Sequence, residues 1–281
     1  MIRHRSAGGE TTAPPPGYRE RMKRVFLTTT PSHRNAYDLF EGRWASDLSE
    51  LLPELPVGGG LPGFRADPRP RQAAEVLGRG GRFDGYDILE LGPLEGAHTC
   101  QLEGLGANSV TAVESNSEAF LKSLIVKNIA GLTRSTFLLG DVSRHLAAPG
   151  PRYDLIFACG ILYHMFDPLE LIRLAAARSD RLFLWTHYYA AQPRLRRHVP
   201  RPVEHEGMPL TLHELTYRDR GLATFWGGNQ GKTRWMELPD LIRVLAHHGL
   251  SETTIITDDP DFVNGPAVTL AARRPGASSP A

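Results

Sequence analysis

The chain has 281 residues, 41% of them hydrophobic, which is enough to fill the core of one large α/β domain with additions. Its 32 basic and 31 acidic side chains leave a net charge of +1, which disfavours a global attraction to RNA or to an acidic membrane. Because only Cys100 and Cys159 are cysteines, and there is neither an apolar signal core nor an apolar run of about 18 residues, we expect a cytoplasmic protein without membrane contact.

The N-terminal part carries two compositional signals. Residues 1–17 are rich in Gly, Thr and Pro and predict a disordered tail. Residues 18–82 predict a helical extension, which is broken by a Pro/Gly linker at 53–62 and ends with a short helix at 71–77. Aromatic residues of the extension are expected either to cover a ligand as a lid or to form a separate hydrophobic cluster.

Between residues 83 and 273, apolar runs alternate with helical periods. The pattern predicts strands at 87–91, 109–114, 135–140, 153–159, 181–187, 252–256 and 267–272, and helices at 99–105, 117–129, 168–177 and 238–248. This alternation is typical of an α/β fold with a mostly parallel sheet and helices on both faces. Residues 274–281 predict a flexible tail.

Residues 190–235 form an insertion after the fifth predicted strand and are rich in arginine. A loop of this length is usually functional or disordered, and its arginines either bind an acidic group or form a solvated face. His205, Glu206 and His213 do not have the spacing of a helical pair of metal ligands, and the cysteines are too few for a zinc cluster. We therefore expect no metal site.

Residues 86–98 predict a buried strand, a glycine turn and a helix, which is the geometry that holds a nucleotide-like cofactor. The glycines stand at 92 and 96, while Leu94 occupies the position where a dinucleotide-binding loop needs glycine. The turn therefore suits a cofactor without phosphates. Its backbone N–H groups and the acidic Glu90 suit a zwitterionic amino-acid tail.

Three more predicted strand ends carry candidate residues. Glu114 follows Gly92 by 22 residues, where a carboxylate accepts both ribose hydroxyls, and Asp141 is placed to accept from an adenine amine. The fourth strand ends at Cys159 and Gly160, beside the expected reactive end. Each residue also has a structural alternative, namely a tight turn, a surface charge or a helix cap.

Residues 83–272 resemble the class I S-adenosylmethionine-dependent methyltransferases. More narrowly, the motifs LELGPLEG (89–96) and GILYHMFDP (160–168) resemble a bacterial branch that includes relatives of the wobble-uridine carboxymethyltransferases. The resemblance implies a Rossmann-like seven-stranded sheet with the strand order 3-2-1-4-5-7-6, an antiparallel seventh strand, and S-adenosylmethionine as cofactor. The candidate cofactor-binding residues are Glu90, Gly92, Pro93, Leu94, Glu95, Gly96, Glu114, Ser115, Gly140, Asp141, Val142, Cys159, Gly160 and His164.

A sulfonium already activates its methyl group, so such a protein mainly holds a nucleophile in line and excludes water. His164, His187 and Tyr188 are the candidate catalytic residues. The alternatives are packing near the cofactor for His164 and a hydrogen-bonded scaffold role for His187, while Tyr188 is either a wall of the site or a donor. The candidate acceptor-binding residues are Tyr18, Tyr37, Phe40, Trp44, Tyr163, Tyr189 and Trp226. The fourth strand is not followed by Asn/Asp-Pro-Pro-aromatic, a motif of enzymes that methylate nucleobase or glutamine amide nitrogens.

The sequence therefore favours a methyltransferase that acts on a small molecule in bacterial specialised metabolism, at oxygen, nitrogen or an electron-rich carbon such as that of an indole. Two alternatives stay open: a tRNA-modifying (carboxy)methyltransferase, and a cofactor-binding regulatory module without turnover. The acceptor, the need for a general base and the oligomeric state are left undecided by the sequence.

Overall fold

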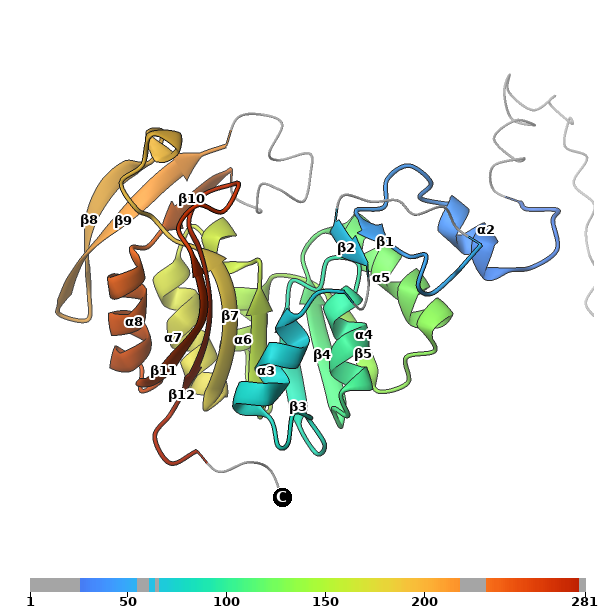
Figure 1. Ribbon diagram of the computed structural model, residues 1–281, viewed down its shortest axis with the longest axis horizontal. Helices are drawn as coiled ribbons and strands as arrows, with labels where there is room; N and C mark the ends of the chain where they lie inside the picture. The colour runs from blue at the N-terminus through green and yellow to red at the C-terminus, as the bar shows by residue number, and fades with distance from the viewer. Residues whose placement is uncertain (1–25, 55–60, 64–65, 218–230, 278–281) are drawn as a thin grey trace, which may run out of the picture. The chain divides into compact units, whose positions relative to one another are not determined.

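A computed structural model describes residues 26–54, 61–63, 66–217 and 231–277 (Figure 1). The chain divides into two units, residues 1–39 and 40–281. In the described part of the first unit, the short helix α2 (His33–Asp38) begins at Ser32, whose hydroxyl accepts the N–H of Asn35 at 3.2 Å. Tyr37 lies on α2, whereas Tyr18 and the predicted disordered tail lie outside the described residues.

The second unit is built on a seven-stranded sheet with the order β11-β12-β7-β6-β3-β4-β5 (Figure 1). Its strands are β3 (Asp87–Leu91), β4 (Ser109–Glu114), β5 (Ser135–Leu139), β6 (Leu155–Cys159), β7 (Arg181–His187), β11 (Glu252–Asp259) and β12 (Ala267–Arg273). Numbered along the chain from β3, this order reads 3-2-1-4-5-7-6. β12 runs antiparallel to both of its neighbours. The predicted α/β fold class is confirmed.

Helices cover both faces of this sheet (Figure 1). They are α3 (Arg69–Leu77), α4 (Ala97–Gly104), α5 (Ser117–Ala130), α6 (Val142–Ala147), α7 (Pro168–Arg178) and α8 (Leu238–His247), with short 3₁₀ turns η1 (Leu162–His164) and η2 (Pro193–Leu195). One core packs α3 and α4 on the sheet, and the other packs α6, α7 and α8. Because β6 is buried at every position, its sequence is a continuous apolar run rather than an alternating one.

The predicted helical extension needs correction in the second unit. Residues 40–54 contain turns and the short strand β1 (Ser46–Asp47), which pairs in parallel with β2 (Leu61–Gly63). The N–H groups of Ala45 and Ser46 donate to the side chain of Glu95 and not to a carbonyl one helical turn earlier. The carboxylate of Glu95, which is distant in the chain, thus accepts the backbone hydrogen bonds that a helix would have formed internally.

The insertion folds into a three-stranded antiparallel sheet that we did not predict, made of β8 (Val199–His205), β9 (Met208–Thr216) and β10 (Lys232–Trp235). Pro200 and Pro202 lie on β8, which is an edge strand of this sheet and so tolerates residues without an N–H donor. Trp226 lies outside the described residues.

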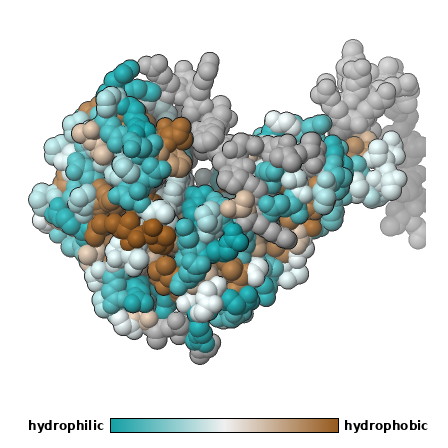
Figure 2. Space-filling view, in the orientation of Figure 1, coloured by the Kyte–Doolittle hydropathy of each residue, from teal (hydrophilic) through white to brown (hydrophobic). Residues whose placement is uncertain are grey.

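The surface of the second unit is mixed. Figure 2 shows polar residues over most of the visible face and a group of apolar residues over the edge strands, where Ile255 of β11 is 45% exposed. Among the described residues, no helix combines the length and the apolar character that are needed to span a bilayer.

Candidate functional site

The carboxyl ends of the parallel strands bring the predicted strand-end residues to one edge of the sheet. β3 pairs with β4 and β6, and β6 pairs with β7, so the segments that follow these four strands are neighbours. The N–H of Gly140, after β5, donates to the carbonyl of Glu114 at 2.8 Å. This edge is where open α/β sheets bind their ligands.

The turn after β3 needs glycine at two positions. Gly92 and Gly96 have φ angles of +70° and +86°, and a Cβ on Gly96 would lie 3.3 Å from the ring of Phe137. Leu94 also has a positive φ of 53°, and its N–H donates to Glu114 Oε2 at 3.0 Å. The end of β4 thus holds the turn in place.

Glu90 is a buried carboxylate with an incomplete set of partners. Thr99 Oγ1 donates to Glu90 Oε2 at 2.5 Å, whereas Oε1 is buried without a hydrogen-bond partner among the described residues. Burial, which outweighs the hydrogen bond from Thr99, and the nearby charge of Glu114 together raise the pKa of Glu90 to about 8. A buried carboxylate oxygen of this kind is costly unless a donor or a cation reaches it.

Arg69 is a site residue that the sequence analysis missed. Its Nε donates to Asp67 Oδ1 at 2.8 Å, and its guanidinium lies 4.8 Å from the centre of the Trp185 ring. Burial raises the pKa of Asp67, but hydrogen bonds from Arg69 and His98 hold that pKa well below its usual range. No sequence signal marks Arg69, because its partner Asp67 is also bound by His98, which lies on α4. Asp67 and His98 are 31 residues apart in the chain.

Burial lowers the pKa of Arg69, but the hydrogen bond to Asp67 and the neighbouring Cys159 and Tyr163 raise it overall. Cys159 and Tyr163 belong to the end of β6 and the segment after it, so the guanidinium reaches the same sheet edge as Glu90. The edge therefore combines the buried carboxyl group of Glu90 with a cation that Asp67 holds in place.

Glu114 and Asp141 stand where we expected them and already have protein partners. Glu114 Oε1 accepts the N–H of Asn116 at 2.8 Å, and burial raises the pKa of this carboxyl group. Each of its oxygens has a second lone pair for a hydroxyl donor. Asp141 Oδ1 accepts the N–H of Arg144 at 2.9 Å, so Asp141 does cap α6. Ser115 is exposed, and Val142 is buried beneath the turn.

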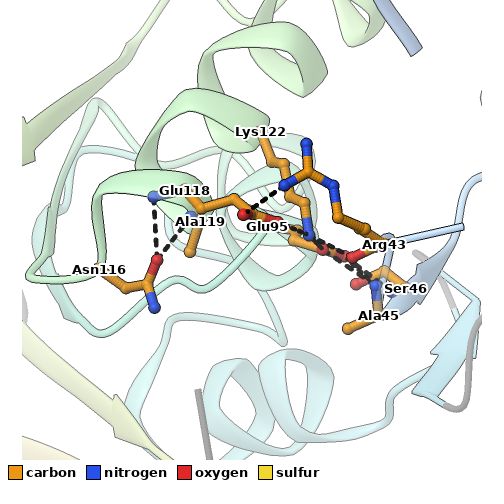
Figure 3. A network of polar contacts seen from close by, with 8 residues as sticks. All are labelled: Arg43, Ala45, Ser46, Glu95, Asn116, Glu118, Ala119 and Lys122. Carbon is orange, nitrogen blue, oxygen red and sulfur yellow. Dashed lines mark hydrogen bonds and ion pairs between the residues drawn. The ribbon is translucent and has the colours of Figure 1, made fainter. Parts of the chain in front are cut away.

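Glu95, a predicted cofactor-binding residue, has a carboxylate that is occupied by protein partners (Figure 3). Its carboxylate accepts from the N–H groups of Ala45 at 3.0 Å and Ser46 at 2.7 Å, and from Lys122 Nζ at 2.9 Å. Lys122 Nζ also donates to the carbonyl of Arg43. Glu95 is 1% exposed, so its oxygens serve to fix residues 43–46 beside the turn.

The predicted lid residues Phe40 and Trp44 pack on α5. Lys122 Nζ lies 5.7 Å from the centre of the Phe40 ring and 5.6 Å from that of Trp44, and the two rings are 6.0 Å apart. Trp44 is 8% exposed. These contacts correspond to the separate hydrophobic cluster rather than to an aromatic cage for an acceptor.

The reactive end is lined by aromatic and imidazole rings. His187 stacks on Trp235 with ring centres 5.1 Å apart and meets the Tyr163 ring edge-on at 4.6 Å. His187 Nδ1 lies 3.0 Å from the carbonyl oxygen of Gly265 and 3.2 Å from that of Pro266. Since carbonyls only accept, Nδ1 carries the proton and Nε2 is the nitrogen that accepts one. Burial lowers the pKa of His187.

His164 and the insertion close this end from the other side. Burial and the nearby His187 lower the pKa of His164 to about 4, and its Nδ1 lies 3.2 Å from the hydroxyl of Tyr217. The indole Nε1 of Trp235 and the hydroxyl of Thr233 both donate to the carbonyl of Tyr163. The unpredicted strand β10 is thus part of the site wall.

Tyr188 and Tyr189 face other partners. The hydroxyl of Tyr188 donates to Asp258 Oδ1 on β11 at 2.8 Å, and this residue belongs to the core beneath α7 and α8. Strand alternation puts it on the opposite face from His187, and its catalytic role stays a prediction. Tyr189 stacks on His213 of the insertion with ring centres 3.4 Å apart.

No protein-family model and no curated protein matches this sequence. Solved structures do match its fold. The N-terminal domain of EvdMO1 with SAH bound has a TM-score of 0.62 at 23% identity, over 86% of this chain and 95% of that one. An S-adenosylmethionine-dependent methyltransferase from Mesorhizobium loti has a TM-score of 0.50 at 15% identity, over 75% and 100% of the two chains.

A third match, an S-adenosylmethionine-dependent methyltransferase from Clostridium acetobutylicum, has a TM-score of 0.50 at 13% identity and covers 87% of this chain and all of its own. At these identities the likeness concerns the fold. The chain has the Rossmann-like fold of S-adenosylmethionine-dependent methyltransferases.

Proposed function

We propose that this protein is an S-adenosylmethionine-dependent methyltransferase that acts on a small-molecule acceptor. The observation that carries the proposal is a pair of complementary groups at one sheet edge: the buried carboxyl group of Glu90, which has one unpartnered oxygen, and the guanidinium of Arg69. Glu90 would hold the ammonium group of the cofactor and Arg69 its carboxylate. Glu114 would accept from the ribose hydroxyls and Asp141 from the adenine amine.

When bound, the cofactor supplies a methyl group that its sulfonium has already activated. The rings of Tyr163, Trp185 and Trp235 then exclude water and orient a planar or apolar acceptor. His187 Nε2 is the base that takes the proton of a hydroxyl or N–H acceptor, because Nδ1 is fixed as the donor to two carbonyls. An electron-rich carbon is the third acceptor type.

The charges of the insertion support a small molecule over a nucleic acid. Arg201, Lys232 and Arg234 converge on the buried carboxylate of Glu214, at 3.5, 3.3 and 3.3 Å. Arg194 donates to the carbonyl of Phe262 at 2.7 Å. Side-chain cations that are already paired within the protein neutralise few phosphates. They therefore release few counterions from RNA and add little to its affinity. Bacterial specialised metabolism is the setting that we propose for such an acceptor.

Isothermal titration tests the cofactor, with S-adenosylmethionine expected to bind and NADH not. The variant Arg69→Gln should lose about ten- to a hundredfold in affinity, because it removes a charge-assisted contact. Arg152→Gln, which removes an exposed arginine paired with Asp180, should bind like the unaltered protein. Absence of S-adenosylmethionine binding would refute the proposal.

Turnover needs a separate experiment. The protein is incubated with methyl-labelled cofactor and panels of phenols, amines and indoles, and the products are identified by mass spectrometry. Labelled product from any small molecule supports the proposal. Label that enters bulk tRNA and no small molecule would favour the RNA-modifying alternative, and cofactor binding without any transfer would favour the regulatory module.

A further inference from the structure

Four side chains with metal-binding groups meet at the tip of the β8–β9 hairpin, away from the sheet edge described above. His205 ends β8, Glu206 lies in the following turn, and His247 and His248 end α8. Figure 1 shows this hairpin running alongside α8. His205 Nε2 lies 2.8 Å from His248 Nε2, and Glu206 Oε2 lies 2.8 Å from His247 Nε2.

One donor atom each from His205, Glu206 and His248 lies within 4.8 Å of the other two. Two ligands of one tetrahedral zinc ion, with bonds of about 2.0–2.1 Å, are about 3.3 Å apart. The separation of 2.8 Å between the two imidazole nitrogens is therefore within about half an ångström of the spacing that a shared ion needs. Small changes in the side-chain torsion angles of the two histidines therefore suffice for both to bind one ion.

We propose that His205, Glu206 and His248 bind a divalent transition-metal ion, of which Zn²⁺ is the best match. Two imidazoles and one carboxylate form the donor set that zinc prefers, whereas Ca²⁺ and Mg²⁺ need more oxygen ligands. His247 donates to the Glu206 carboxylate and acts as a positioning residue for it. Arg173, the cation that also faces Glu206, is paired with Glu170 at 2.6 Å.

The hairpin geometry explains why these residues meet. His205 pairs with Met208, which leaves Glu206 and Gly207 as a two-residue turn with φ angles of 49° and 81°. The turn holds the hairpin tip against the end of α8, 41 to 43 residues further along the chain. His213, which the sequence analysis considered instead of His248, lies elsewhere and contacts Glu237 at 3.2 Å.

The ion would have a structural role, not a catalytic one. β9 continues from this hairpin to β10, whose side chains donate to the carbonyl of Tyr163 at the reactive end. A metal at the tip therefore fixes the insertion to α8 and so stabilises one wall of the candidate active site.

The test uses the full chain after treatment with a chelator, titrated with Zn²⁺ against a coloured competitor. We expect one tight site per chain and a Zn²⁺-dependent rise in melting temperature. His205→Asn and His248→Asn should each weaken binding by at least tenfold and abolish the rise. His145→Asn, a partly buried histidine on α6, is the matched control and should bind like the unaltered protein.

Addition of Co²⁺ gives a readout that does not depend on stability, because a site with nitrogen and oxygen ligands near tetrahedral geometry absorbs visible light strongly. This absorption should disappear in His205→Asn. Absence of Zn²⁺ binding by the unaltered chain, or equal affinity in the His205, His248 and His145 variants, would overturn the proposal. Neither readout depends on S-adenosylmethionine, so the outcome is independent of the proposed methyltransferase activity.

Discussion

At the scale of single residues, Glu90 combines a structural cost with the binding role that we propose for it. Its pKa is raised to about 8 from a value of 4.5, mainly by burial, so the folded protein holds this proton more tightly than the unfolded chain. The resulting contribution to stability is fully present below about pH 4.5 and is lost as the pH rises through about 8. A cation that reaches the free oxygen would favour the ionised form and reverse this effect.

We therefore expect the melting temperature of the cofactor-free protein to fall as the pH is raised from 5.5 to 8.5. In the variant Glu90→Gln this fall should be several degrees smaller. The glutamine stays neutral, so deprotonation no longer costs stability. Differential scanning calorimetry across this range measures the effect. Glu103→Gln is the control, because Glu103 is a buried carboxylate that already accepts from Thr133 and Ser135. Equal pH slopes for the unaltered protein and Glu90→Gln would contradict this account.

His187 allows a second test at this scale. The variant His187→Asn keeps an N–H donor for the carbonyls of Gly265 and Pro266 but lacks the nitrogen that accepts a proton. We expect kcat for a hydroxyl acceptor to fall by about a hundredfold or more, with an unchanged affinity for S-adenosylmethionine. Steady-state kinetics and titration separate the two effects.

The matched control for this variant is His198→Asn. His198 is also buried, packs on Trp235 and donates from Nδ1 to a carbonyl, that of Leu195. Its replacement should leave kcat within a fewfold of the original value. A pH profile adds a further check: because burial lowers the pKa of His187, activity should persist below pH 6.5 before it declines. If both variants lose kcat equally, His187 has only a scaffold role.

At the scale of elements, the segment of residues 40–54 is held by one buried charge network rather than by a helical ladder. Glu95 from the glycine turn and Lys122 from α5 form an ion pair at 2.9 Å, and both bind backbone groups of the segment. Removing one partner of a buried pair leaves the other charge uncompensated, which is strongly destabilising. The turn and the segment are therefore coupled.

We expect Glu95→Gln to speed amide hydrogen exchange at Ala45 and Ser46 by about tenfold or more, because the amide accepts fewer bonds and leaves Lys122 without its closest counter-ion. Exchange measured by NMR or mass spectrometry tests this. Glu118→Gln is the control, since Glu118 pairs with Arg43 and Lys122 at a more exposed position. Protection that is equal in the two variants would show that the network does not hold the segment.

At the scale of the whole molecule, the proposed ligand bridges segments after several strands of the same sheet. Glu90, Glu114 and Asp141 follow or end β3, β4 and β5, and Arg69 begins α3. A ligand that binds only when these segments are in place stabilises the folded state against unfolding by about 2.7 kcal/mol at a hundredfold excess over Kd.

We therefore expect S-adenosylhomocysteine at such an excess to raise the melting temperature of the full chain by about 5–10 °C. NADH at the same concentration should leave it unchanged, because Leu94 stands where a pyrophosphate needs glycine. Thermal denaturation followed by circular dichroism provides the measurement. A rise with NADH that matches the rise with S-adenosylhomocysteine would contradict the interpretation of the turn.

The sequence predicted features that depend on local pattern. The strands from β3 to β7 and the helices α4, α5 and α7 follow from apolar runs and helical periods, whereas the short helix α6 was not predicted. Gly92 and Gly96 were recognisable because their backbone angles require glycine, and the placement of Glu114 followed from its position at a strand end.

The insertion was not predictable as a sheet. Its strands carry prolines and charged residues, and their apolar side chains belong to the same core cluster as those of α7 and α8. Residues 40–54 fell within the predicted helical extension, whereas the bonds that hold them join residues 49 and 50 positions apart, Ser46 and Ala45 with Glu95.

By itself, the sequence determined the class of fold and the positions of the glycine turn, Glu114 and Asp141 at strand ends, because these features depend on short stretches of neighbouring residues. Only the tertiary structure decided the rest: that the guanidinium of Arg69 reaches the end of β6, that Glu95 binds the backbone of Ala45 and Ser46, and that His248 joins His205 and Glu206. These contacts form between segments distant in the chain, and their geometry is set by how the core packs.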